Sequence, residues 1–294
     1  MPELTLATLV AQVFTGLVLG MILVLLAIGL SLIFGLMTVV NFAHGSLYML
    51  GAYLGFFLIG YTKSFWLALV VAPLLVGAFG FGIERFLVRR LYGRSIDDPL
   101  LLTFGLSLVM IEAARLIWGK IGLTLDPPRE LAGAVDLGFT YFPLYRLFVI
   151  GVTIVVLLAL YLFLEKTNVG LIIRAGSRDP LMVRALGFDL GRVWLLVFGI
   201  GAALAGLAGI LAGPMRGVYA EMGVTIVIES FVVVVVGGMG SLVGAIVAGI
   251  VMGEVVSLTT LFAPKFAEIM VFIVMALVLL VRPSGLFGEA GLME

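Results

Sequence analysis

The only histidine of the chain, His44, lies in the motif Asn41-Phe-Ala-His44-Gly-Ser46 and is the first candidate for chemistry. Histidine acts as a base or a metal ligand when carboxylates or thiols accompany it. No carboxylate stands beside it, and the chain contains no cysteine. We therefore interpret Asn41, His44 and Ser46 as groups that hydrogen-bond the backbone at a bend, with a position beside a transport pathway as the alternative. We expect no catalytic residue, no metal site and no cofactor.

Carboxylates within apolar runs form the second set of candidates. Glu112 and Arg115 are three residues apart, a spacing that allows an ion pair on one helix face. Glu229 and Glu254 have no obvious partner close by in the sequence. Because ionisable groups are costly at membrane depth, each glutamate is a candidate for lining a pathway, with packing against a neighbouring helix or a place nearer the interface as alternatives.

Glycines cluster in the segment Gly237-Gly-Met-Gly-Ser241. The segment does not match the dinucleotide fingerprint GxGxxG, because Val243 stands where the third glycine belongs. Three glycines in four residues favour a helix break, and broken membrane helices tend to line cavities. Gly237, Gly238, Gly240 and Ser241 are therefore candidates for the lining of a translocation path.

A short capped helix is predicted near residues 179–187. Asp179 supplies an N-cap acceptor, Pro180 suits the first helical position, and Gly187 suits the stop. The helix carries Leu186 as an apolar contact, with Arg178 and Arg184 as charges. Such a short helix is unstable alone in water. It must dock either on this protein or on a partner, and the residues alone favour neither.

The elements that position these residues follow from composition. Hydrophobic residues make up 63% of the 294 and charged residues only 12%, with a mean hydropathy of +1.30. That is too little charge for a water-facing surface, so an all-α integral membrane bundle of about eight to nine transmembrane helices is predicted. The expected helices span residues 10–36, 46–60, 65–88, 99–118, 145–164, 193–213, 224–236, 241–260 and 266–282. The seventh is short and is either a crossing or a re-entrant piece.

Basic residues predict the orientation, because cytoplasmic loops carry an excess of Lys and Arg. Three regions hold ten of the 17 basic residues: Arg85, Arg89, Arg90, Arg94, Lys166, Arg174, Arg178, Arg184, Arg192 and Arg282. We place these regions in the cytoplasm and the 119–143 loop outside. The C-terminus is then cytoplasmic and the N-terminus extracytoplasmic. The formal net charge of zero gives no indication of nucleic-acid binding.

Small residues recur at every fourth position in two stretches of the sequence, and on a helix this spacing lines one face, which indicates close packing of helices in lipid. The two rows are Gly201, Ala205, Gly209 and Gly213, and Gly237, Ser241, Ala245, Gly249 and Gly253.

Four motifs carry a resemblance to a known family, and they fall in order along nearly the whole chain. They are Gly29-Leu-Ser-Leu-Ile-Phe-Gly35 with Asn41-Phe-Ala-His-Gly45; residues 174–187 running into 198–209; Gly237-Gly-Met-Gly-Ser-Leu-Val-Gly-Ala245; and Arg282-Pro-Ser-Gly-Leu-Phe-Gly288. Together they resemble the permease subunits of branched-chain amino acid ABC importers, and most closely the LivH-type subunit. The resemblance is weakest between residues 120 and 145.

The resemblance implies that residues 1–294 form one permease domain in a bacterial or archaeal plasma membrane. It implies a paralogous LivM-like second permease, two cytoplasmic ABC ATPase subunits and an extracytoplasmic binding protein as partners, besides membrane lipid. The 179–187 helix would couple to an ATPase through Arg178, Asp179, Pro180, Arg184, Leu186 and Gly187. The chain has no P-loop motif GxxxxGK[ST] of its own.

Two other classes of function remain as alternatives. A secondary transporter or channel would work alone, and would call for paired acids that bind a coupling ion. A membrane-embedded enzyme would call for a cluster of reactive side chains at one interface. The family resemblance suggests branched-chain or other hydrophobic amino acids as substrate, or a related amide or organic acid. The residues leave the exact substrate open.

Overall fold

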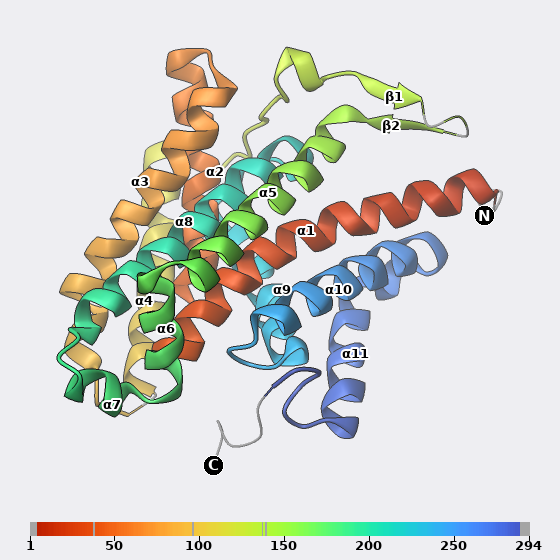
Figure 1. Ribbon diagram of the computed structural model, residues 1–294. Coiled ribbons are helices and arrows are strands. Elements are labelled where there is room, and N and C mark those ends of the chain that lie inside the picture. The colour runs from red at the N-terminus through yellow and green to blue at the C-terminus, as the bar shows by residue number, and fades with distance from the viewer. Residues whose placement is uncertain (1–4, 38, 96, 137, 139, 289–294) are drawn as a thin grey trace.

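The computed structural model describes residues 5–37, 39–95, 97–136, 138 and 140–288. Eleven α-helices dominate this part of the chain, with three short 3₁₀ segments and one small hairpin (Figure 1). The elements are α1 (Leu6–Met37), α2 (Ala43–Thr62), α3 (Phe65–Phe86), η1 (Val88–Leu91), α4 (Asp97–Trp118), η2 (Arg129–Leu131), β1 (Ala134–Asp136), β2 (Tyr141–Pro143), α5 (Leu144–Lys166), α6 (Asn168–Arg178), α7 (Pro180–Ala185), α8 (Leu190–Arg216), α9 (Met222–Gly237), α10 (Leu242–Phe262), η3 (Pro264–Phe266) and α11 (Ala267–Val281).

Eight helical segments are long and apolar enough to cross a membrane. They agree with eight of the nine predicted segments, because lipid offers no hydrogen-bond partner and a spanning chain must satisfy its backbone within a helix. The remaining predicted segment is α9, a helix of 16 residues that is apolar but shorter than the rest. The prediction of a polytopic all-α bundle is therefore confirmed, and α9 is the one predicted segment that is shorter than a full span.

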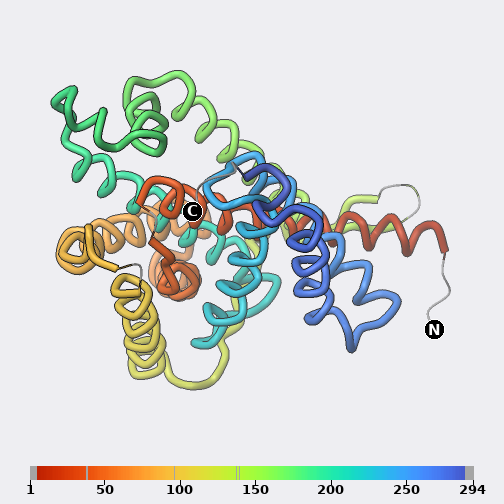
Figure 2. Tube along the Cα trace, turned by 90° about the horizontal axis from the view of Figure 1, so that it is seen from below, coloured from red at the N-terminus to blue at the C-terminus, as the bar shows by residue number. Residues whose placement is uncertain are grey.

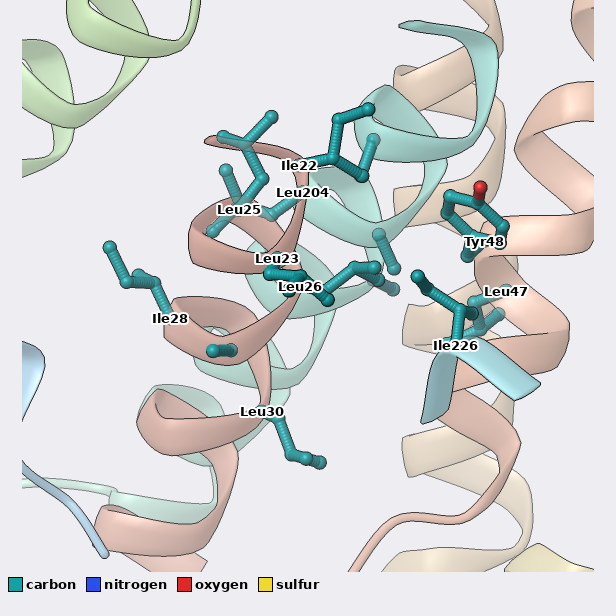
Figure 3. Packing of buried hydrophobic residues seen from close by; sticks show 14 of the residues in the cluster. Ile22, Leu23, Leu25, Leu26, Ile28, Leu30, Leu47, Tyr48, Leu204 and Ile226 are labelled. Atoms are coloured by element: carbon teal, nitrogen blue, oxygen red, sulfur yellow. The ribbon is translucent and has the colours of Figure 1, made fainter. Parts of the chain in front are cut away.

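The part of α1 from Gly16 onward lies at the centre of the bundle, where α10, α8, α9 and α5 bury most of its side chains, while its first turns extend toward the edge (Figure 2). Figure 3 shows α1 side chains such as Leu25 and Leu26 packed beside Leu204 of α8, with Tyr48 of α2 nearby. At the far end of the α1–α10 contact, Gln12 Nε2 donates to the Ser257 carbonyl at 2.6 Å. The Ser257 hydroxyl donates back to the Gln12 carbonyl at 2.7 Å.

The two rows of small residues lie where helices approach most closely. A Cβ on Gly209 would meet the backbone of α2 at Tyr48 and Ala52, and one on Gly253 would meet the backbone of α1 at Gly16 and Gly20. The prediction that these rows pack helices together is confirmed at both positions.

The bundle has two ends, which we name the α7 end and the hairpin end. All three basic regions lie at the α7 end: Arg89 of η1 bonds the start of α8, and Phe287 lines a cavity together with Arg178. The hairpin end holds β1 and β2, paired antiparallel with Val135 opposite Phe142. The start of α1 lies there too, because the Phe14 and Phe142 rings are 5.4 Å apart.

Helix α6 and the β1–β2 hairpin were not predicted. Helix α6 is amphipathic rather than apolar, and the Thr167 hydroxyl caps it by accepting from Gly170 N at 3.0 Å. The hairpin contains a turn in which Asp136 Oδ1 accepts from Gly138 N at 2.8 Å. Hydrophobic run length, the signal that located the spans, reports neither kind of element.

Candidate functional site

Helix α7 has the capped form that the sequence predicted. Asp179 Oδ1 accepts from Met182 N at 2.9 Å, and Pro180 occupies the first turn, where its missing N–H costs nothing. Gly187 ends the helix with φ +88°, a conformation that side chains other than glycine rarely adopt. The preceding helix, α6, stops at Arg178, so α7 stands as a separate short element at the end of the bundle.

The side chains of α7 divide into one buried contact and an exposed apolar face. Val183 is buried against the rest of the chain, while Leu181 and Leu186 are 75% and 68% exposed. Met182 and Phe188 are exposed as well. We name Leu181, Met182, Leu186 and Phe188 the α7 face. The chain therefore holds α7 in place through one side and leaves four apolar side chains without cover.

The two arginines of the predicted contact lie in different places. Arg178 lines a cavity of about 880 Å³ at the α7 end. Arg184 lies with its guanidinium 5.2 Å from the ring centre of Trp194 on α8. Arg184 is exposed, yet its guanidinium contacts another part of this chain.

The glycine-rich break between α9 and α10 has the predicted form. Gly238 and Gly240 have φ of +101° and +83°, and the Ser241 hydroxyl caps α10 by accepting from Gly244 N at 3.1 Å. Gly240 and Ser241 line the same cavity as Arg178. Gly237 instead packs against Gly244, and Gly238 against Gly288. Only part of the break therefore faces open space.

An ion pair also lines this cavity. Arg174 of α6 pairs with Glu165 at the end of α5. Other parts of the wall come from α6, from Gly35 at the end of α1, and from Met239 and Phe287. The cavity lies at the end of the α1–α10 contact, and both polar and apolar side chains line it.

The Asn41–Ser46 motif lies beside the start of α2, deep in the bundle. His44 is fully buried, and its Nε2 donates to the Leu26 carbonyl of α1 at 3.1 Å. The Ser46 and Ser107 hydroxyls are 2.8 Å apart. Both side chains make hydrogen bonds, but to the middle of α1 and to α4, so the prediction that they bond the backbone at the bend itself was wrong.

Asn41 also departs from that expectation. Its side chain is buried, yet neither amide atom has a hydrogen-bond partner among the described residues. The backbone beside it is satisfied by Thr103 of α4, whose hydroxyl donates to the Val40 carbonyl and accepts from Phe42 N, each at 3.2 Å. The prediction that Asn41 itself satisfies the backbone was wrong, because a residue distant in sequence takes that role.

The two membrane glutamates lie apart from each other. A carboxylate oxygen of Glu229 is 4.0 Å from Arg216 at the end of α8. Glu254 lies against Gly16 in the α1–α10 contact, and its Oε2 is buried without a partner among the described residues. The candidate path residues therefore occupy separate places: the α2 start, the α9–α10 break, the Arg216 pair and the α1–α10 contact.

The predicted pair of Glu112 and Arg115 is confirmed, and it has a third member. Arg115 also bonds the Glu221 carboxylate, which precedes α9. The Arg115 guanidinium holds the pKa of the Glu221 carboxyl below its usual value. This cluster ties α4 to the start of α9 at the hairpin end.

A buried carboxylate at the end of α3, Glu84, was missed by the sequence reasoning. It is fully buried beside Arg89 and Tyr92. The available signal was an acidic residue directly after the uncharged run 64–83, with an arginine five positions on.

Comparison with known proteins adds independent findings. Residues 12–281 match the family described as "Branched-chain amino acid transport system / permease component". The chain is 31% identical over 292 residues to the high-affinity branched-chain amino acid transport system permease protein BraD of Pseudomonas aeruginosa, and the match covers 95% of each chain. It is 30% identical over 294 residues to the corresponding protein LivH of Escherichia coli, again covering 95% of each. It is also 29% identical to LivM of the same species, covering 91% of this chain and 68% of LivM.

Proposed function

Because this chain belongs to the family of permease components of branched-chain amino acid transport systems, we propose that it carries branched-chain or similar hydrophobic amino acids across the membrane. The chain is a multi-pass permease subunit of an ABC importer, and the family is one of transport subunits rather than enzymes. The names of the relatives support the substrate class. A related amide or organic acid is the alternative cargo.

In this proposal α7 is the coupling helix, and the observation that carries it is the exposed α7 face. Apolar side chains that no part of this chain covers are stabilised by burial against a partner. Leu181 and Leu186 would enter a groove of a cytoplasmic ATPase, with Asp179, Pro180 and Gly187 fixing the shape of the helix. Arg178 and Arg184 flank this contact.

The remaining partners follow from the same premise. The likeness to LivM supports a paralogous permease as the second membrane subunit. One ATPase subunit would bind α7, and the other would bind the corresponding helix of the paralogous permease. An extracytoplasmic binding protein would deliver the substrate at the hairpin end. Closure of the ATPases would move these two helices and switch the permeases between outward-open and inward-open states.

We place the α7 end in the cytoplasm of a bacterial or archaeal cell, with the chain in the plasma membrane. Ten of the 17 basic residues lie in the three regions at that end, which agrees with the excess of Lys and Arg in cytoplasmic loops. The C-terminus would then be cytoplasmic and the N-terminus extracytoplasmic. Residues 1–4 and 289–294 themselves lie outside the described residues.

For the path, we propose that substrate leaves past Gly240 and Ser241 into the cavity at the α7 end. Glu229 stands toward the entrance in this proposal. Asn41, His44 and Ser46 would adjust the α1–α2 connection, because they are buried among the helices. Gly237 and Gly238 would set the break, and Glu254 would lie behind the path at the α1–α10 contact.

The first test is co-purification of the tagged chain, expressed with its neighbouring genes. We compare wild type with the double variant Asp179→Lys, Leu186→Glu. A matched double variant at the hairpin end, Asp126→Lys with Ile121→Glu, introduces the same changes at two exposed positions. We expect wild type and the matched variant to retain a P-loop ATPase, and the α7 variant to lose it while eluting as a single folded species.

Two outcomes would contradict the coupling role of α7. An ATPase that stays bound to the α7 double variant would remove α7 from the contact. Absence of any ATPase from the wild-type preparation would remove the coupling proposal altogether.

A further inference from the structure

The carboxylate of Glu84 is fully buried at the end of α3 and is held by three hydrogen bonds from side chains. Arg89 donates to it twice, from Nε to Oε1 at 3.1 Å and from Nη2 to Oε2 at 2.9 Å. The Tyr92 hydroxyl donates to Oε1 at 2.7 Å. A buried charge is strongly unfavourable unless paired in this way, so Glu84, Arg89 and Tyr92 form one unit.

This unit is fastened to the start of α8 at two points. Arg89 Nη2 also donates to the Gly191 carbonyl at 2.7 Å. The Tyr92 ring packs edge-on against Trp194, with the ring centres 4.5 Å apart. Burial and the neighbouring Glu84 carboxylate raise the pKa of Tyr92, so its hydroxyl stays protonated and continues to donate.

The same tryptophan contacts α7. The Arg184 guanidinium lies 5.2 Å from the centre of the Trp194 ring, within the range of a cation–π interaction. The indole Nε1 of Trp194 is buried without an acceptor among the described residues, so ring contacts rather than a hydrogen bond hold it there. One side chain thus joins α7 to the unit built on Glu84.

Helices α3 and α8 are packed closely enough to move together. A Cβ on Gly80 would meet Ala202, and one on Gly199 would meet the Phe81 ring. Close-packed helices transmit a displacement instead of absorbing it. A force on α7 therefore has a continuous path of contacts through Arg184, Trp194 and Tyr92 to the α3–α8 pair.

We propose that Trp194 and Glu84 are positioning residues that transmit movement of α7 to the α3–α8 pair, an inference that rests on the coupling role proposed above. Trp194 joins the docked helix to the bundle, and Glu84 keeps η1 and the start of α8 in register with α3. Neither residue touches the substrate or the ATPase. Their loss separates ATP hydrolysis from transport without releasing the ATPase.

The experiment uses the complete transporter in proteoliposomes, with leucine, isoleucine and valine as labelled probes. Uptake and ATP hydrolysis are measured in the same vesicles, and their ratio is compared among wild type, Trp194→Leu, Trp194→Phe and Glu84→Gln. Trp66→Leu serves as the matched control, because Trp66 lies on α3 at the hairpin end. Retention of the ATPase is verified for every variant by co-purification.

We expect Trp194→Leu to keep its ATPase and to lower uptake per ATP by about threefold to tenfold, which lies within the range of mutational effects on coupling between sites. Trp194→Phe, which keeps an aromatic ring, restores most of the ratio. Glu84→Gln lowers the ratio as well, while Trp66→Leu leaves it unchanged. An unchanged ratio in Trp194→Leu overturns the inference. Loss of the ATPase from Trp194→Leu also overturns it, because Trp194 would then belong to the docking contact. A wild-type complex without ATPase refutes the coupling role itself.

Discussion

Among single residues, His44 makes a polar contact while buried among the helices. It is fully buried, its ring lies against Gly29 of α1, and its Nε2–H satisfies the Leu26 carbonyl. The Leu26 carbonyl lies within α1 and already accepts a hydrogen bond from the helix backbone, so removing the ring loses a second hydrogen bond and leaves a cavity, and both cost free energy.

We therefore expect His44→Ala to lower the free energy of unfolding by about 2–4 kcal/mol. The measurement is the thermal denaturation midpoint of the purified chain in detergent. Tyr61→Ala on the same helix is the control, because Tyr61 is 83% exposed and its loss changes little. Equal midpoints for the two variants would show that the His44 contact does not stabilise the fold.

Residues whose roles depend on near neighbours were predictable from the sequence, and the others were not. Asp179, Pro180 and Gly187 act within one short helix, so their types and spacing predicted their geometry. The unit of Glu84, Arg89 and Tyr92 owes its proposed role to its contacts with Gly191 and Trp194, which are about a hundred residues away in the sequence. A single sequence gives no measure of such distant pairings.

At the scale of elements, close contact between helices depends on glycines, which have no side chain to hold the backbones apart. On α8, Gly209 lies against the α2 backbone, while Gly151 on α5 has open space where a Cβ would stand. Both are helical glycines, so alanine offers both the same gain in helix propensity, about 1 kcal/mol. Only their surroundings differ.

Gly209→Ala is expected to destabilise the chain by about 1–3 kcal/mol, since α2 must shift to admit the methyl group. Gly151→Ala is expected to be neutral or slightly stabilising. Denaturation midpoints in detergent compare the two directly. A stable Gly209→Ala would mean that α2 and α8 are not held at the described distance.

The spans were predictable because lipid imposes one rule on every crossing segment, and long apolar runs report it. The short α9 was found for the same reason, and its 16 residues make it shorter than the eight candidate spans. Helix α6 obeys a different rule, since it lies at the α7 end with a mixed surface. The hairpin depends on turn residues such as Asp136 and Gly138, which the length of an apolar run does not report.

For the whole molecule, the family predicts that energy comes from separate ATPase chains. Proteoliposomes that contain only this permease are expected to show no concentrative uptake of leucine, isoleucine or valine. Vesicles with the paralogous permease and the ATPases, supplied with ATP and binding protein, are expected to accumulate at least one of them. Concentrative uptake by the permease alone, driven by an ion gradient, would instead support a secondary transporter.

The α1–α10 contact joins two helices that are synthesised at very different times, which affects membrane insertion of the nascent chain. Gln12 and Ser257 are 245 residues apart, so the first helix leaves the ribosome long before its main neighbour. At roughly 5–20 residues per second, the interval is about 12–50 s. Throughout that time the glycine-rich side of α1 faces lipid or the insertion machinery. Nascent chains that stop before α10 leave this side uncovered, and we expect membrane quality-control proteases to degrade them.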